Sequence, residues 1–230
     1  GYIFEEFKRF FRKNNLINEN WNGLNILVQN ASTVGLLDLK ILQDKEKSSS
    51  FFDDLKDKKF KLLYLLGSDN LEFQKNDEFI VYQGSHGDRG AEIADLILPS
   101  ATYTEQNGLY ENLEGRIQEC KKASYPIGEA LEDWKIFNQI TKKLGSKDYK
   151  VNFDELRKEV LETAPNFSGI NELPKKSVIK TNNIETSFFS EKIFVRELDY
   201  YYTNSISRSS KTMSECRQIR QKIKKDGTNN

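Results

Sequence analysis

The stretch that decides the fold is residues 79–115, FIVYQGSHGDRGAEIADLILPSATYTEQNGLYENLEG. It contains two short, largely apolar runs, residues 79–82 and 94–98, each closed by turn-forming residues. A third such run, residues 61–66 (KLLYLL), stops at Gly67. Short runs that do not alternate apolar with polar residues are typical of strands buried on both faces of a sheet. Three of them in succession predict a mostly parallel, Rossmann-like α/β sheet with flanking helices.

The loop after residues 79–82 carries three glycines, Gly84, Gly87 and Gly90. Ligands of such folds lie at the carboxyl ends of the strands, and a glycine-rich loop there can bring backbone N–H groups close to a phosphate. The spacing matches neither GxGxxG nor GxxxxGK[ST], and the loop has no lysine. The incomplete motif favours the other explanation, that the glycines let the chain turn sharply beneath a neighbouring segment.

Three carboxylates follow in the same stretch, Glu105, Glu111 and Glu114. Paired carboxylates can perform acid–base chemistry, but here no histidine, cysteine or aspartate completes a recognisable catalytic set. We therefore expect charge pairing instead. The cations expected for these pairs are Arg89, Arg116 and Lys121.

His86 is the single histidine of the chain. A histidine in a glycine loop could carry protons, but a catalytic role needs partners, so a hydrogen-bonded structural residue is expected. The two cysteines, Cys120 and Cys216, are too far apart in sequence for a CxxC metal site, an iron–sulfur ligand set or a disulfide framework. We expect no catalytic, cofactor-binding or metal-ligating residues, and no cofactor.

The composition restricts the class of partner. Of 230 residues, 35 are Lys or Arg and 35 are Asp or Glu, so the net charge is zero. This balance gives no general basic surface and argues against nucleic-acid binding. No apolar run approaches ~18 residues, so we expect no transmembrane helix.

The predicted division has three parts: an N-terminal amphipathic helix in residues 1–19, an α/β core in 20–145, and a helical and extended C-terminal region in 146–230. Apolar residues recur at helical spacing in the first part, namely Ile3, Phe4, Phe7, Phe10 and Phe11. This helix either docks on another subunit, packs on its own domain, or is the remnant of a mitochondrial presequence. The adjacent glutamates Glu5 and Glu6 argue against the presequence.

Further elements follow from local patterns. We expect a strand at 24–28, helices at 34–42 (capped by Ser32 or Thr33), 51–58 and 153–163, a connection with one short strand at 108–118, and a loop-like segment at 167–183. A helix at 132–144 is expected to place Trp134, Phe137, Ile140 and Leu144 on one face. Residues 193–202 are aromatic and apolar. The basic segment 213–225 either contacts an anionic lipid or acidic partner, or is a solvated helix face.

Residues 82–134 closely resemble the C-terminal half of the large iron–sulfur subunit of respiratory complex I, NADH:ubiquinone oxidoreductase. The matching text is YQGSHGD (82–88), GAEIADLILP (90–99), ATYTE (101–105), YENLEGR (110–116) and EDWK (132–135). Upstream LNIL (24–27), NAS (30–32) and LLGSD (65–69) are similar to the family too. The tail, YTNSISR (202–208), TM (212–213) and Cys216, resembles the mitochondrial members.

The resemblance implies a molybdopterin-oxidoreductase-type fold that in complex I has lost its cofactor and is structural. Full-length members also have an N-terminal region whose cysteines hold iron–sulfur clusters, and this chain has two cysteines in all. We therefore expect a noncatalytic C-terminal piece of the subunit, in the matrix-side peripheral arm at the mitochondrial inner membrane. Either the subunit is encoded in two pieces or this chain is a fragment, and we favour the split subunit. Its expected partners are other complex I subunits, above all the N-terminal iron–sulfur piece, in an obligate hetero-oligomer that supports electron transport from NADH to ubiquinone.

Two other functions remain open from the sequence. One is an enzyme domain of molybdopterin oxidoreductase type that still binds a pterin or nucleotide, which metal analysis and ultraviolet spectra would detect. The other is an assembly factor, which would be absent from the mature complex.

Overall fold

The computed structural model describes residues 2–28, 30–41, 51–68, 71, 73–172 and 199–227. Contacts group the chain into two compact units. The hairpin unit comprises Gly1–Asp44, Leu109–Cys120 and Asn152–Val195, and the sheet unit comprises Lys45–Gly108, Lys121–Val151 and Arg196–Asn230. The division into residues 1–19, 20–145 and 146–230 stays a prediction.

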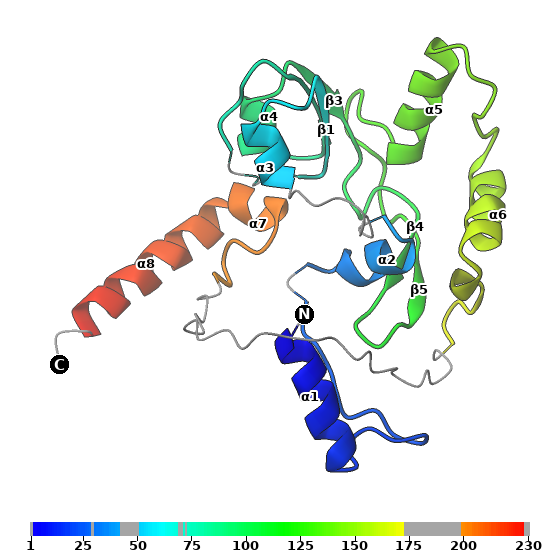
Figure 1. The fold of residues 1–230 in the computed structure, drawn as a ribbon. Helices are drawn as coiled ribbons and strands as arrows, with labels where there is room; N and C mark the ends of the chain where they lie inside the picture. The colour runs from blue at the N-terminus through cyan, green and yellow to red at the C-terminus, as the bar shows by residue number, and fades with distance from the viewer. Residues whose placement is uncertain are drawn as a thin grey trace. The chain divides into compact units, whose positions relative to one another are not determined.

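The sheet unit is built on three parallel strands, β1 (Leu62–Leu66), β2 (Phe79–Gly84) and β3 (Leu96–Pro99) (Figure 1). Their order is β1-β2-β3, and both pairs are parallel. In this register Leu65 lies opposite Tyr82, which in turn lies opposite Ile97. The predicted α/β class and the three parallel strands are confirmed.

One face of the sheet carries the core of this unit. Leu63, Leu65, Ile80 and Tyr82 point into it and are buried together with Leu55 of α3 (Phe51–Lys56). Ala91 of α4 (Arg89–Glu92) packs against the same cluster, so both short helices cover the same face (Figure 1). Local apolar runs thus become a core because side chains two residues apart on each strand share a face.

The other face is covered only in part, by α5 (Asp133–Lys143), where the rings of Tyr64 and Phe137 stack with centroids 5.4 Å apart. The prediction that every strand is buried on both faces is right for the middle of β2 and wrong for β1 and β3. Leu62 is 57% exposed and Ile97 is 51% exposed. The physical reason is that β1 and β3 are the edge strands of this three-stranded sheet, so fewer neighbours cover them.

Helix α5 begins and ends where predicted, and Gly145 follows it with a φ of 75°. Its buried face is different from the predicted one. Ile136 is the buried residue of α5, while Phe137 is 40% and Leu144 79% exposed. Polar contacts of Glu132 and Asp133 hold the first turn of the helix, and Phe137 of the predicted face stacks on Tyr64.

The hairpin unit contains α1 (Tyr2–Lys13), α2 (Thr33–Asp38), the strands β4 (Gly108–Glu111) and β5 (Ile117–Cys120), α6 (Phe153–Thr163) and the 3-10 turn η1 (Pro165–Ser168). Ile117, Ala164 and Phe167 form its small core. The Asn152 side chain caps α6 by accepting the N–H of Glu155 at 2.9 Å, and α6 ends just before Pro165, as predicted.

Three local predictions are wrong in this unit. Residues 24–28 form no strand, and no strand among the described residues pairs with them to complete a backbone ladder; Leu27 is 84% exposed. Helix α2 stops at Asp38, and Lys40 has a φ of 60°; Ser32 stands at its N-cap but its side chain makes no capping hydrogen bond. The connection 108–118 holds two strands instead of one, because the Asn112 side chain and Gly115 close a tight turn between them.

The sheet unit ends in two helices, α7 (Ser205–Ser209) and α8 (Lys211–Gly227). A capping box between Asn204 and Ser207 begins α7. Helix α8 contains the predicted basic segment 213–225. Among the described residues no helix is both long and apolar enough to span a bilayer. Residues 173–183 and 193–198 of the predicted loop and aromatic segments lie outside the described residues.

The uneven burial of the sheet gives a direct test of where its core lies. Ile80→Ala in the full chain is expected to lower the free energy of unfolding by about 2–5 kcal/mol, since Ile80 is fully buried. Ile97→Ala is the matched control on the neighbouring strand, with an expected loss of less than about 1 kcal/mol. Urea unfolding followed by tryptophan fluorescence measures both, and equal losses would contradict the assigned core.

Candidate functional site

The carboxyl ends of the strands are the place where a ligand of this fold class would bind. Gln83, near the end of β2, is fully buried there. Its amide oxygen accepts the hydroxyl hydrogen of Tyr64 from β1, and its Nε2 donates to Oδ1 of Asp133 at 2.6 Å. Burial, and then the negative charge of Asp133, raise the pKa of Tyr64, so the hydroxyl keeps its proton and remains a donor.

Asp133 is held from a second side by Gln106. The Nε2 of Gln106 donates to Oδ2 of Asp133 at 2.9 Å, and the backbone N–H of Asp133 donates to Oε1 of Gln106 at 3.1 Å. Both carboxylate oxygens of Asp133 and both polar atoms of Gln83 are therefore hydrogen-bonded within the protein. We call Tyr64, Gln83, Gln106 and Asp133 the carboxyl-edge network.

Glu132, the residue before α5, is a buried carboxylate with its own partners. It accepts hydrogen bonds from Lys122 at 3.2 Å, Lys135 at 3.1 Å and the indole of Trp134 at 3.0 Å. Burial alone would raise the pKa of Glu132, but these three donors outweigh it and lower the pKa. Glu132 is thus an anion at neutral pH that holds the start of α5.

The glycine loop lies over the ring of Tyr82. The Tyr82 hydroxyl donates to the backbone carbonyl of His86 at 2.6 Å. A Cβ added at Gly84 would lie 2.2 Å from that hydroxyl oxygen, and one at Gly90 would lie 2.7 Å from the carbonyl oxygen of Ser68. Around Gly87 nothing lies within 4 Å. Gly84 and Gly90 therefore allow close packing against neighbouring segments, as the sequence indicated.

His86 is half-buried in this loop, and its Nδ1 lies 2.9 Å from the hydroxyl oxygen of Ser85. The expected hydrogen bond is confirmed. Its structural role stays a prediction.

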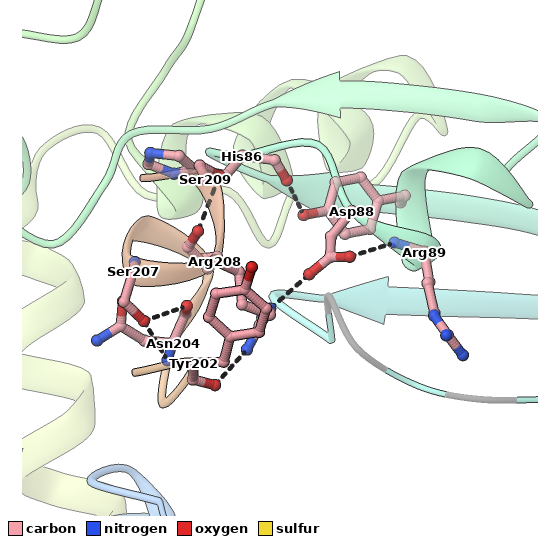
Figure 2. Close-up of polar contacts among 10 residues, drawn as sticks. His86, Asp88, Arg89, Tyr202, Asn204, Ser207, Arg208 and Ser209 are labelled. Atoms are coloured by element: carbon pink, nitrogen blue, oxygen red, sulfur yellow. Dashed lines mark hydrogen bonds and ion pairs between the residues drawn. The ribbon is translucent and has the colours of Figure 1, made fainter. Parts of the chain in front are cut away.

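The loop is joined to the C-terminal part of the sheet unit by an ion pair, which Figure 2 shows between Asp88 and Arg208. Asp88 accepts the backbone N–H of Arg89 at 2.9 Å and the Nε hydrogen of Arg208 at 2.5 Å. Burial alone would raise the pKa of Asp88, but the hydrogen bonds from Arg208 and Arg89 outweigh it and lower the pKa. The ion pair connects residues 120 positions apart.

The three glutamates singled out in the sequence do not form one site. Glu105 accepts the backbone N–H of Thr102 at 3.2 Å in the sheet unit, while Glu111 is buried and Glu114 exposed in the hairpin unit. The expected pairing of these glutamates with the predicted cations stays a prediction. The carboxylates of Glu105 and Glu111 have other partners, which for Glu111 is the carboxyl group of Asp38. The cations expected to pair were Arg89, Arg116 and Lys121.

The two cysteines lie on different elements, Cys120 on β5 of the hairpin unit and Cys216 on α8 of the sheet unit. Within the described ranges there is no cluster of three or more His, Cys, Asp or Glu side chains able to hold a metal ion. Sequence reasoning missed the carboxyl-edge network and the Asp88–Arg208 pair. The signal available for them was that Gln83, Asp88, Asp133 and Arg208 all stand in the family-like motifs.

Comparisons with known proteins agree with this fold. Residues 2–143 match the model of the molybdopterin oxidoreductase family. The chain belongs to the molybdopterin oxidoreductase family. Residues 164–216 match a second model, which describes the C-terminal region of the G subunit of NADH-ubiquinone oxidoreductase.

Several curated relatives match this chain over most of its length. It is 39% identical to the NADH-ubiquinone oxidoreductase 75 kDa subunit of Reclinomonas americana, over 94% of this chain and 32% of the relative. It is 38% identical to the G subunit of the NADH-quinone oxidoreductase of Rickettsia bellii, over 94% of this chain and 30% of the relative. It is 36% identical to the mitochondrial NADH-ubiquinone oxidoreductase 78 kDa subunit of Neurospora crassa, over 88% of this chain and 27% of the relative. The chain spans about a third of the length of these relatives, and the predicted resemblance is confirmed.

The family name implies a pterin cofactor, whose place in this fold class is the carboxyl edge of the sheet. A pterin there would need free polar groups and space beside the loop. In this chain the side chains of the carboxyl-edge network are hydrogen-bonded to one another, and Tyr82 fills the space under Gly84. No cysteine stands in the loop. The described residues therefore do not fit the cofactor, and no chemical step is assigned to it.

The packing of Tyr82 predicts different effects for two glycines of the same loop. Gly84→Ala is expected to destabilise the full chain by about 1–3 kcal/mol, because the new methyl group must displace the Tyr82 ring. Gly87→Ala, the matched control, is expected to be neutral or stabilising by up to about 1 kcal/mol. Thermal unfolding measures both. If a phosphate-binding backbone were the reason for the glycines, the two variants would have similar stabilities.

Proposed function

We propose that this chain is a noncatalytic structural part of mitochondrial complex I, in the matrix-side peripheral arm at the inner membrane. Support comes from the names of its relatives, NADH-ubiquinone oxidoreductase subunits that include mitochondrial ones, and from the match of residues 164–216 to the C-terminal region of such a subunit. In this role the chain supports NADH-to-ubiquinone electron transfer by bracing the neighbouring subunits that carry iron–sulfur clusters.

The observation that carries the noncatalytic part of the proposal is the closed carboxyl edge. Polar side chains that a cofactor enzyme would present to its ligand are here bonded to one another, from Tyr64 through Gln83 to Asp133 and Gln106. A buried, fully hydrogen-bonded network adds rigidity and positions the elements it connects. This arrangement serves a scaffold, which must keep its shape under its neighbours.

The proposed partners are other complex I subunits, above all the iron–sulfur region that precedes this part in full-length relatives. We propose that this region is a separate polypeptide and that the assembly is an obligate hetero-oligomer. The exposed aromatic residues of α1 support docking of this helix: Phe7 is 52% and Phe10 58% exposed. Isolated apolar side chains at a surface are ordinary, but two on one short helix are suited to a partner.

The proposal predicts a stable, stoichiometric and metal-free component. Affinity purification of the tagged chain from mitochondria is expected to yield mature complex I with one copy of the chain, migrating at the mass of this polypeptide. The chain separated from that complex is expected to contain neither iron nor molybdenum by elemental analysis. Stoichiometric molybdenum or a pterin absorbance would support the enzyme alternative, and presence on assembly intermediates alone would support an assembly factor.

Docking through α1 predicts a defect in assembly without a defect in folding. Phe7→Ser combined with Phe10→Ser is expected to lower incorporation into complex I at least severalfold, because the aromatic surface is lost, while the isolated chain keeps its unfolding midpoint. Lys13→Ser, an exposed change on the same helix, is the matched control. Native gels and unfolding curves measure the two properties. Wild-type incorporation of the double variant would contradict the docking role.

A further inference from the structure

The second face of the three-stranded sheet, opposite to the core of the sheet unit, carries a row of apolar side chains from all three strands. The register places Leu62 of β1 opposite Phe79 of β2. Two residues further along β2, Val81 lies opposite Leu96 of β3. Side chains alternate between the faces of a strand, and the intervening Ile80 points into the core. The four apolar residues therefore share the other face.

The amino half of this second face is open to solvent. Leu62 is 57%, Phe79 47% and Leu96 44% exposed, while Val81 beside them is buried. We call Leu62, Phe79 and Leu96 the open patch. A single exposed apolar residue is ordinary, but three that adjoin one another across three strands are typical of a surface that binds another protein segment.

An amphipathic helix is the neighbour that fits the open patch. Parallel sheets occur almost only in folds that have helices on both faces. On the carboxyl half of the same face α5 has this place, because its Phe137 stacks on Tyr64 and its Asp133 is hydrogen-bonded to Gln83. The patch extends over two strand spacings, ~10 Å, which is about two turns of a helix. Apolar residues at i, i+4 and i+7 of such a helix can contact all of it.

The length of the relatives indicates a source for this helix. The chain covers 32%, 30% and 27% of the three relatives described above, so most of each relative lies outside the matched part. Layers that pack around one sheet ordinarily belong to one domain. The unmatched part of the large subunit is therefore the first place to look for the missing helical layer.

We propose that the open patch docks an amphipathic helix from the part of the complex I large subunit that this chain does not span. The inference rests on the proposed function and deepens it, because it names the surface on which the proposed partner polypeptide binds. The docked helix lies beside α5 and completes the second helical layer of the sheet. Removing the open patch from water supplies the driving force for association.

Photo-crosslinking from the open patch identifies what covers it. Phe79 is replaced by p-benzoylphenylalanine in the tagged full chain, which is purified from mitochondria with its bound partners and irradiated. The expected product joins position 79 to an amphipathic helical segment of the unmatched part of the large subunit. Tyr125, an exposed aromatic residue of the same unit, is the matched control position, where the yield of this product is expected to be at least severalfold lower.

A product formed only within this chain, with a second copy or with a different subunit would overturn the inference, as would a yield at position 79 no higher than at position 125. Failure of the proposed function is a separate result, in which the chain is absent from complex I on native gels. The crosslinked peptide decides the inference in that case too, because it is identified in whichever assembly the chain is purified with.

Substitution within the open patch gives a second readout. Leu62→Thr combined with Leu96→Thr is expected to lower recovery of the large-subunit partner at least severalfold. The unfolding midpoint is expected to change little, because both positions are about half exposed and threonine is well suited to strands. Ile127→Thr, at an 84% exposed position of the same unit, is the matched control and is expected to keep wild-type recovery. Undiminished recovery with the double variant would contradict docking at the patch.

Discussion

The carboxyl end of the sheet depends on satisfying the buried amide of Gln83. A buried side-chain amide without hydrogen-bond partners would destabilise the folded state. Gln83 therefore needs a donor for its amide oxygen and an acceptor for its amide nitrogen. Tyr64 supplies the donor from β1, and Asp133 supplies the acceptor from the first turn of α5. Gln106 completes the shell around Asp133. One buried residue thus joins two strands, a helix and a loop into a single arrangement.

The same edge supports the proposed scaffold role of a fold that is associated with cofactor enzymes. The loop is closely packed at two of its glycines: Tyr82 lies under Gly84, and the carbonyl of Ser68 lies beside Gly90. Between these two glycines the loop passes Asp88. There the ion pair with Arg208 ties it to α7. Charge-assisted contacts of this kind, in which both side chains are mostly buried, position segments more firmly than exposed pairs do.

Two buried glutamates show how local surroundings decide the state of one side-chain type. Glu132 faces two lysines and an indole N–H, which lower its pKa and keep it charged. Burial, followed by the negative charge of Asp38 and the hydrogen bond to it, raises the pKa of Glu111 to about 7. The same side chain therefore has a lowered pKa in the sheet unit and a raised pKa in the hairpin unit. The difference lies in which charges the fold brings beside each carboxyl group.

The sequence by itself determined the three parallel strands, the helix at 153–163 ended by Pro165, and membership of the family, because each depends on neighbouring residues: apolar runs, caps, breakers and continuous motifs. It did not determine whether residues 24–28 would find a partner strand, since an apolar run alone does not supply one. Nor did it show that Gln83 meets Asp133 or that Asp88 meets Arg208. Only the tertiary structure decided these contacts, because partners from 50 to 120 positions apart leave no periodic trace along the chain, and burial and pKa depend on such contacts.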